Sequence, residues 1–400
     1  MISTDLGYNT IQSSGPFSFL IFRMTRPIQA LVHRSALKHN LARIKTLCPS
    51  TPILAVVKAN AYGHGIERVY EGLRGAEGFG VLEVSEASRL RALGWRGPIL
   101  LLEGVFDARE LEECSRLKLW HTVHCQAQID WLVRHKTHEP HRVFLKMNSG
   151  MNRLGFGPES FKAAYTRLVA CPQVQEVSLM THFSDADVPA GVNAQLATFQ
   201  THASDLGAEI SLCNSAAALI QPKELDLGQD WARIGIALYG GSVNPQAQSA
   251  QAWGLLPALT LKSEVIALQT VRAGQSVGYG STFTASRDTR IGIVACGYAD
   301  GYPRHAESGT PVLVHGVRSQ TVGRVSMDML AVDLEPLLST SGMDSHNIGV
   351  GTEVTLWGES SLGTRLEIDE VAQSAGTLAY ELMCGLSTRV PISMDEGSDA

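Results

Sequence analysis

The sequence lacks the cysteine pattern of a disulfide-bonded or zinc-binding protein. Its 7 cysteines are scattered along 400 residues, and no two of them form a Cys-x-x-Cys pair. A disulfide framework usually has an even number of cysteines, and a structural zinc site needs closely spaced pairs. We therefore predict reduced thiols, a cytoplasmic location and no metal site.

Long runs of one charge and long apolar runs are also missing. The formal net charge is −6 and no stretch is rich in lysine and arginine, which argues against a nucleic-acid partner. The apolar run Phe17–Phe22 is too short to span a membrane, and it lacks the flanking residues of a secretory signal. We expect no membrane partner, and we expect residues 1–25 to be a dispensable extension.

Glycine is abundant, and the apolar pattern alternates between strand-like and helix-like segments. The 38 glycines exceed the usual share of about 7% and indicate many tight turns. From residue 35 to residue 213, short apolar runs alternate with segments whose apolar residues lie three and four positions apart. Repeated strand–helix units predict a parallel (β/α)8 TIM-type barrel with its active site at the carboxyl ends of the strands. A doubly wound open sheet is the alternative, but no Gly-x-Gly-x-x-Gly follows the first strand.

The pattern changes after residue 241. Residues 242–257 are polar and contain proline, glycine and glutamine, as a linker would. Beyond Leu259, short β-type runs separated by glycine predict a mostly β C-terminal domain, followed by one late helix at 367–383. The expected division of the chain is an extension at 1–25, a barrel at 26–245, a β-rich domain at 258–391 and a flexible tail at 392–400.

One buried strand is expected to deliver a lysine to the barrel mouth. The apolar run Ile53–Val57 leads directly into Lys58, and turn-forming residues follow before a helix begins at Ile66. A lysine at the end of a buried strand is costly to desolvate. It therefore reaches solvent at the rim, pairs with a charge, or loses its own charge by forming a Schiff base.

The segment around this lysine, AVVKANAYGHG, resembles the cofactor-lysine motif of the alanine racemases, which are fold-type III enzymes that hold pyridoxal phosphate (PLP) on that lysine. The resemblance extends from about Arg26 to Pro391. It implies a (β/α)8 barrel with a β domain behind it, and a PLP-dependent enzyme that interconverts L- and D-alanine with two bases. It also implies a supply of D-alanine for peptidoglycan, and a homodimer with shared active sites.

Three further motifs match the family at catalytic and substrate-binding positions. The strand VFLKM and the segment NSGMNRLG place Lys146 and Arg153 near the same rim as Lys58. By resemblance Lys146 is often carbamylated and Arg153 helps bind the substrate carboxylate, for which a guanidinium fork is well suited. VGYGSTF resembles the catalytic tyrosine motif, so Tyr279 would take the proton from L-alanine and Lys58 from D-alanine. Met327, in GRVSMD, would contribute a backbone contact to the substrate.

The resemblance also implies a set of cofactor-binding residues. It aims Arg233 at the pyridine nitrogen of PLP, and an arginine is practically never deprotonated, so that nitrogen stays largely neutral. A neutral ring is a weaker electron sink, which helps to suppress transamination. His182 would stack on the ring. A hydroxyl and free N–H groups at a helix start form an anion site, and the residues implied for the phosphate are Tyr62, Ser215, Gly235, Ile236 and Tyr380.

Three rival functions compete with this interpretation. A non-catalytic PLP-binding carrier shares the barrel but lacks a second domain, so residues 258–391 and Tyr279 count against it. A fold-type III decarboxylase would need an acidic residue at the pyridine nitrogen, where Arg233 is expected. A racemase of broader amino-acid specificity is left open by the sequence.

Overall fold

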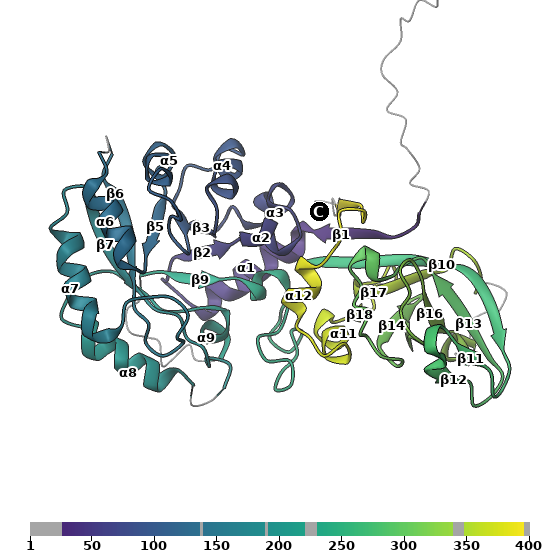
Figure 1. Ribbon diagram of the computed structural model, residues 1–400. Helices are drawn as coiled ribbons and strands as arrows, with labels where there is room; N and C mark the ends of the chain where they lie inside the picture. The colour runs from purple at the N-terminus through teal and green to yellow at the C-terminus, as the bar shows by residue number, and fades with distance from the viewer. Residues whose placement is uncertain (1–25, 137–138, 189–190, 221–229, 339–347, 396–400) are drawn as a thin grey trace, which may run out of the picture.

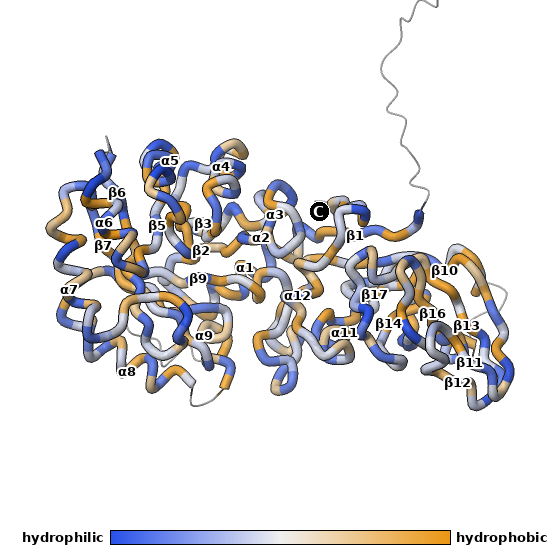
Figure 2. Tube along the Cα trace, viewed as in Figure 1, coloured by the Kyte–Doolittle hydropathy of each residue, from blue (hydrophilic) through white to orange (hydrophobic). Residues whose placement is uncertain are grey.

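The structure is a computed structural model, and the residues that it describes are 26–136, 139–188, 191–220, 230–338 and 348–395. The predicted extension at 1–25 lies outside these residues. Figure 1 shows a parallel sheet wrapped by helices on the left and a mostly β part on the right. In Figure 2, apolar residues run along the barrel strands, and hydrophilic residues alternate with them on the surrounding helices. Within the described residues, no helix is long and apolar enough to cross a membrane.

The first part is a nearly closed barrel of eight parallel strands in the order β8-β7-β6-β5-β4-β3-β2-β9. The N–H of Asp230 donates to Ile210 O at 3.0 Å and that of Arg233 to Cys213 O at 2.9 Å, which brings β9 against β8. The predicted TIM-type fold is thereby confirmed. The strands are β2 (Ile53–Val56), β3 (Gly78–Val81), β4 (Ile99–Leu101), β5 (Trp120–Val123), β6 (His141–Lys146), β7 (Val174–Met180), β8 (Ile210–Ser211) and β9 (Ala232–Ile234).

Helices cover the outside of these strands, because each has one apolar face. In α1 (Arg34–Leu47), for example, Leu37, Leu41 and Ile44 are buried, as their spacing predicts. The helix predicted to begin at Ile66 begins there. The remaining helices of this part are α3 (Ile66–Leu73), α4 (Val84–Ala92), α5 (Glu110–Leu117), α6 (Gln126–Arg134), α7 (Pro158–Val169), α8 (Gly191–Ala203) and α9 (Ser215–Ile220).

The second part is built on a nine-stranded sheet around the long strand β10 (Leu259–Val271), which confirms the predicted β-rich domain. A register shift between Val265 and Ala267 allows β10 to pair with β1 and β17 along one half and with β13 along the other. This sheet also contains β13 (Thr289–Val294), β14 (Pro311–Val314), β15 (Val317–Gln320), β16 (Leu330–Asp333), β17 (Glu353–Glu359) and β18 (Arg365–Leu366). Strands β11 (Ser276–Val277) and β12 (Phe283–Thr284) pair with each other in a separate two-stranded sheet. The short helical segments of this second part are η2 (Tyr279–Ser281), η3 (Tyr298–Asp300) and α10 (Glu335–Leu338), whereas η1 (Ile236–Tyr239) directly follows β9 in the barrel.

Both ends of the described chain join this second sheet. Strand β1 (Gln29–His33) precedes the barrel but pairs antiparallel with β10, and β19 (Ile392–Asp395) pairs parallel with β1. The tail predicted to be flexible from residue 392 therefore begins as a strand, because its backbone bonds to β1. Residues 396–400 lie outside the described residues.

Two segments differ from the sequence prediction. The single late helix expected at 367–383 is two helices, α11 (Ile368–Ser374) and α12 (Ala379–Cys384). Gly376 has a φ of 66° and ends the first helix. The polar segment 242–257 is not a free linker, because Asn40, which is buried, donates to Leu256 O at 2.8 Å and accepts from Leu256 N at 2.8 Å.

Candidate active site

A cavity of about 400 Å³ lies at the carboxyl ends of the barrel strands, where parallel barrels hold their active sites. Ten of the residues predicted from the sequence line it. They are Lys58, Tyr62, Lys146, Arg153, His182, Ser215, Arg233, Gly235, Ile236 and Tyr380. The barrel therefore brings together in one cavity residues that are far apart in the sequence.

Two predicted residues do not reach this cavity. Tyr279, in η2, is 71% exposed and Met327 is 53% exposed, and both belong to the second domain. Their turns are neighbours, since a Cβ atom added at Gly278 would lie 3.3 Å from Arg324 N. Within one chain, the structure thus separates the expected tyrosine base from the lysine.

A left-handed turn presents Lys58 to the cavity. Lys58 begins the short element α2 (Lys58–Tyr62), in which Ala59, Asn60, Ala61 and Tyr62 all have φ between 52° and 56°. This conformation costs about 1–2 kcal/mol for each non-glycine residue. Asn60 compensates in part, because its N–H donates to Glu86 Oε1 at 3.0 Å and its Oδ1 accepts from Arg89 Nη2 at 2.7 Å. Backbone strain of this kind is typical of functional sites.

The guanidinium of Arg233 forms the buried floor of the cavity. It donates to Ser211 O at 2.8 Å, Ser211 Oγ at 2.6 Å and Thr181 O at 2.7 Å, and lies 3.5 Å from His182 Nδ1. Burial lowers the pKa of Arg233 to about 10, so the group stays charged at neutral pH. Burial and then the charge of Arg233 lower the pKa of His182 to about 2, so this histidine is neutral. A neutral ring beside a fixed cation suits packing against a ligand better than proton transfer.

The cavity has an excess of positive charge. Lys58, Lys146, Arg153 and Arg233 line it, and among the described lining residues Glu103 is the single carboxylate. Burial, followed by the charges of Arg233 and Arg153, lowers the pKa of Lys146 to about 8. Glu103 was not predicted. It directly follows the apolar run of β4, and a polar residue after a buried barrel strand is the signal that could have identified it.

Hydroxyl and amide groups form a small cradle beside these cations. Ser215 Oγ accepts from Gly235 N at 2.9 Å, and a Cβ atom added at Gly235 would lie only 2.3 Å from Tyr62 Oη. Tyr62 stacks on Tyr239 with ring centroids 4.6 Å apart and lies 6.1 Å from the ring of Tyr380. Burial raises the pKa of Tyr62 and of Tyr380, which keeps both hydroxyls protonated. These donors fit a phosphate group, and Lys58 and Arg233 fit the aldehyde and the ring nitrogen of PLP.

Comparison with known proteins agrees with this geometry. Residues 32–243 match the family model described as alanine racemase, N-terminal domain, and residues 258–394 match alanine racemase, C-terminal domain. The alanine racemase of Paracidovorax citrulli (strain AAC00-1) is 60% identical over 373 residues, which cover 93% of this chain and 100% of that protein. The crystal structure of biosynthetic alanine racemase from Pseudomonas aeruginosa superimposes on this chain with a TM-score of 0.84 and 44% sequence identity. The match covers 92% of this chain and 99% of the Pseudomonas chain. Alanine racemase from Acinetobacter baumannii has a TM-score of 0.82 and 36% identity, with coverage of 92% and 100%.

The barrel, its lysine-bearing cavity and these similarities define an amino-acid racemase, which is an isomerase. Within that class, the chain belongs to the alanine racemase family, whose members use PLP. The family predicted from the sequence is thereby confirmed. The non-catalytic carrier and the decarboxylase are not supported, and a broader specificity is not favoured.

Proposed function

We propose that the chain interconverts L- and D-alanine with PLP held on Lys58, in an active site that two copies of the chain build together. The observation that carries this proposal is the cavity itself. It joins a lysine, a buried arginine and a cradle of hydroxyl and amide donors, yet Tyr279 of the same chain is not among its described lining residues. When bound, PLP supplies an electron-withdrawing ring that stabilises the negative charge left on Cα after the proton departs.

The proton transfers are assigned to two side chains on opposite faces of the substrate. Lys58 Nζ exchanges the proton with D-alanine and Tyr279 Oη, supplied by a second copy, exchanges it with L-alanine. Arg153 at the cavity mouth binds the substrate carboxylate, and Met327 of the second copy contacts it through its backbone. Arg233 would keep its own proton while facing the ring nitrogen of bound PLP, which would leave that ring a moderate electron sink and favour racemisation over transamination.

Lys146 is proposed to carry a carbamate. A pKa of about 8 leaves about a tenth of its amine uncharged at pH 7, far more than for an ordinary lysine. The free amine can attack carbon dioxide, forming an N–C bond and releasing a proton. The resulting anion would offset neighbouring cations and orient Arg153.

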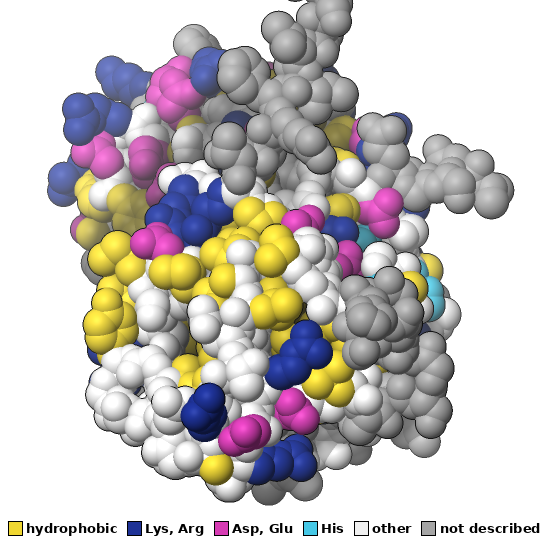
Figure 3. Space-filling model, turned by 90° about the vertical axis from the view of Figure 1, so that its right-hand side faces the viewer, with side chains coloured by type: hydrophobic (Ala, Val, Ile, Leu, Met, Phe, Trp, Pro, Cys, Tyr) yellow, Lys and Arg dark blue, Asp and Glu magenta, His cyan; other side chains and the backbone are white. Residues whose placement is uncertain are grey.

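The second domain offers a surface for a second copy. Figure 3 shows apolar side chains across the end of the molecule, with Lys, Arg, Asp and Glu among them. Contiguous exposed apolar patches mark interaction sites. The exposed large apolar side chains of the second domain, apart from Tyr380 in the cavity, are Ile266, Leu268, Tyr279, Tyr298, Met327, Met329, Val350, Leu362 and Leu378. We propose a cytoplasmic homodimer that supplies D-alanine for peptidoglycan. We retain the division into a barrel at 26–245 and a β-rich domain at 258–391, with β1 crossing to the second sheet.

Borohydride reduction followed by peptide mapping tests the cofactor assignment. We expect the purified protein to be yellow, and reduction to fix the chromophore on Lys58. Lys58→Ala should lose covalent attachment, whereas Lys146→Ala, the control in the same cavity, should keep it. Labelling of Lys146, or of no lysine, would overturn the assignment.

A further inference from the structure

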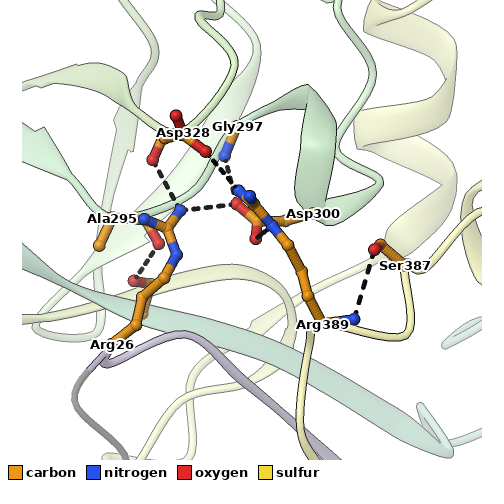
Figure 4. Close-up of polar contacts among 8 residues, drawn as sticks. Arg26, Ala295, Gly297, Asp300, Asp328, Ser387 and Arg389 are labelled. Atoms are coloured by element: carbon orange, nitrogen blue, oxygen red, sulfur yellow. Dashed lines mark hydrogen bonds and ion pairs between the residues drawn. The ribbon is translucent and has the colours of Figure 1, made fainter.

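A buried carboxylate outside the cavity joins distant parts of the chain (Figure 4). Asp300 is fully buried, and its Oδ2 accepts from Arg26 Nη2 at 2.7 Å and from Gly297 N at 2.8 Å. Its Oδ1 accepts from Arg389 Nε at 2.7 Å. Burial alone would raise the pKa of Asp300, but the hydrogen bonds from Arg389, Gly297 and Arg26 hold it below its ordinary value. The group is therefore a buried anion with two cationic partners.

The same two arginines also bind Asp328, the residue that follows Met327. Arg26 Nη2 donates to Asp328 O at 2.7 Å, and Arg389 Nη2 donates to Asp328 Oδ1 at 2.7 Å. Arg26 precedes β1 and Arg389 precedes β19, so the two ends of the described chain meet at one turn. We call Asp300, Arg26 and Arg389 the arginine clamp.

The clamp fixes two turns against each other. Tyr298 N donates to Ser326 O at 3.0 Å and Ala299 N donates to Met327 O at 3.0 Å. No space is left between the turns, since a Cβ atom added at Gly297 would lie 2.3 Å from both Ser326 O and Met327 O. A rigid unit therefore presents Met327 and Tyr298, which are 53% and 37% exposed, on the surface of the second domain.

The sheet beneath does not depend on the clamp. Strands β13 and β16, which flank the two turns, pair with each other from Ile291 and Asp333 to Val294 and Leu330. Loss of one arginine contact should thus displace the turns and leave the strands paired. A role in placing Met327 explains why so many charged groups are gathered at an exposed turn.

We propose that Asp300, Arg26 and Arg389 are positioning residues, which hold Met327 for substrate binding in the cavity of a second copy. This inference rests on the proposed function, because it needs Met327 to act in the other copy's site. It predicts that damage to the clamp raises the KM for alanine while the bound cofactor keeps its absorbance.

Arg389→Lys is the first test, because Arg389 is 40% exposed and lysine keeps the charge but cannot bind both aspartates in one plane. Asp300→Asn is a second variant, which keeps the shape of the side chain. Loss of one charge-assisted hydrogen bond corresponds to about a tenfold or larger rise in KM, with a smaller change in kcat. Lys262→Gln is the control, since it breaks a part-buried pair with Glu353 at 3.2 Å in the same domain without touching either turn. An Arg389→Lys enzyme with the KM of the control would overturn the proposal.

A mixed dimer separates a positioning role from a merely structural one. One subunit carries Lys58→Ala with an intact clamp, and the other carries Arg389→Lys with an intact Lys58. The working cavity then lies in the Arg389→Lys subunit but receives Met327 from the other subunit, so its KM should return to the wild-type value. A KM that stays raised would show that the clamp acts within its own chain and would refute the proposal. The mixed dimer of Lys58→Ala and Tyr279→Phe, assayed in parallel, reports independently whether sites are shared at all.

Discussion

The cations of the cavity come from different points of the chain, Lys58 after β2, Lys146 at the end of β6 and Arg233 within β9. The resemblance of the surrounding motifs to those of the alanine racemases predicted all three, and Lys58 and Lys146 also stand at the end of apolar runs that predict barrel strands. Glu103 also follows a barrel strand, β4, but the sequence alone does not distinguish a cavity-lining carboxylate after a strand from an exposed loop residue. The role of Asp300 could not be predicted either, because Arg26 lies 274 positions away in the sequence.

Three histidines form a cluster away from the cavity and make stability depend on pH. His121 and His141 have ring centroids 5.1 Å apart, and those of His135 and His141 are 5.5 Å apart. Neither ring nitrogen of His121 has a hydrogen-bond partner among the described residues. Burial, reinforced by His141, lowers the pKa of His121 to about 3, and burial lowers that of His141 to about 4.

The unfolded chain should therefore bind protons on His121 and His141 below pH about 6.5, where the folded chain does not. We expect the free energy of unfolding to fall from pH about 6.5 towards pH about 4, by up to about 1.4 kcal/mol per pH unit for each buried histidine. Urea unfolding of His121→Leu at several pH values should show a shallower decline. The same change at exposed His39 is the control, and equal slopes in both variants would contradict the assignment.

At the scale of elements, the departures from prediction occur where the backbone leaves its preferred conformations. Four consecutive residues of α2 have positive φ although none is glycine, and side-chain type alone favours a right-handed turn there. Tertiary contacts from Glu86 and Arg89 decide the outcome. The late helix was predicted to run from 367 to 383 on the apolar spacing of Ile368, Val371, Ala372 and Ala375, but Gly376 ends α11 directly after these residues.

The junction of β9 and η1 packs directly against α2, and Gly235→Ala tests this contact. The added Cβ atom would lie 2.3 Å from Tyr62 Oη, so one of the two must move. Overpacking of this kind costs about 1–3 kcal/mol, which corresponds to a loss of about 5- to 150-fold in PLP affinity if the whole cost falls on the bound state. Titration of the cofactor-free protein with PLP measures this loss. Gly349→Ala is the control, because a Cβ atom there would meet nothing within 4 Å, and equal affinities would show that Gly235 and Tyr62 do not form the cradle.

At the scale of the whole molecule, the change of pattern after residue 241 was enough to predict a barrel and a β domain. It could not show that β1 and β19 both join the second sheet, because the sequence of a strand of four or five residues does not indicate which distant strand it pairs with. Nor could it show how the chain places Tyr279. The structure leaves that side chain 71% exposed and outside the lining of its own cavity, which is the geometry expected if a second copy uses it.

Complementation between two inactive variants, Lys58→Ala and Tyr279→Phe, tests the shared site most directly. In a mixed dimer one site carries both changes and the other carries neither, because the two residues of a site come from different subunits. Co-expression with two tags allows the mixed dimer to be isolated and its alanine racemisation measured. We predict about half of the wild-type activity per mixed dimer, and about a quarter in a randomly associated mixture. A mixed dimer as inactive as its two parents would show that Tyr279 serves its own chain and would contradict the shared site.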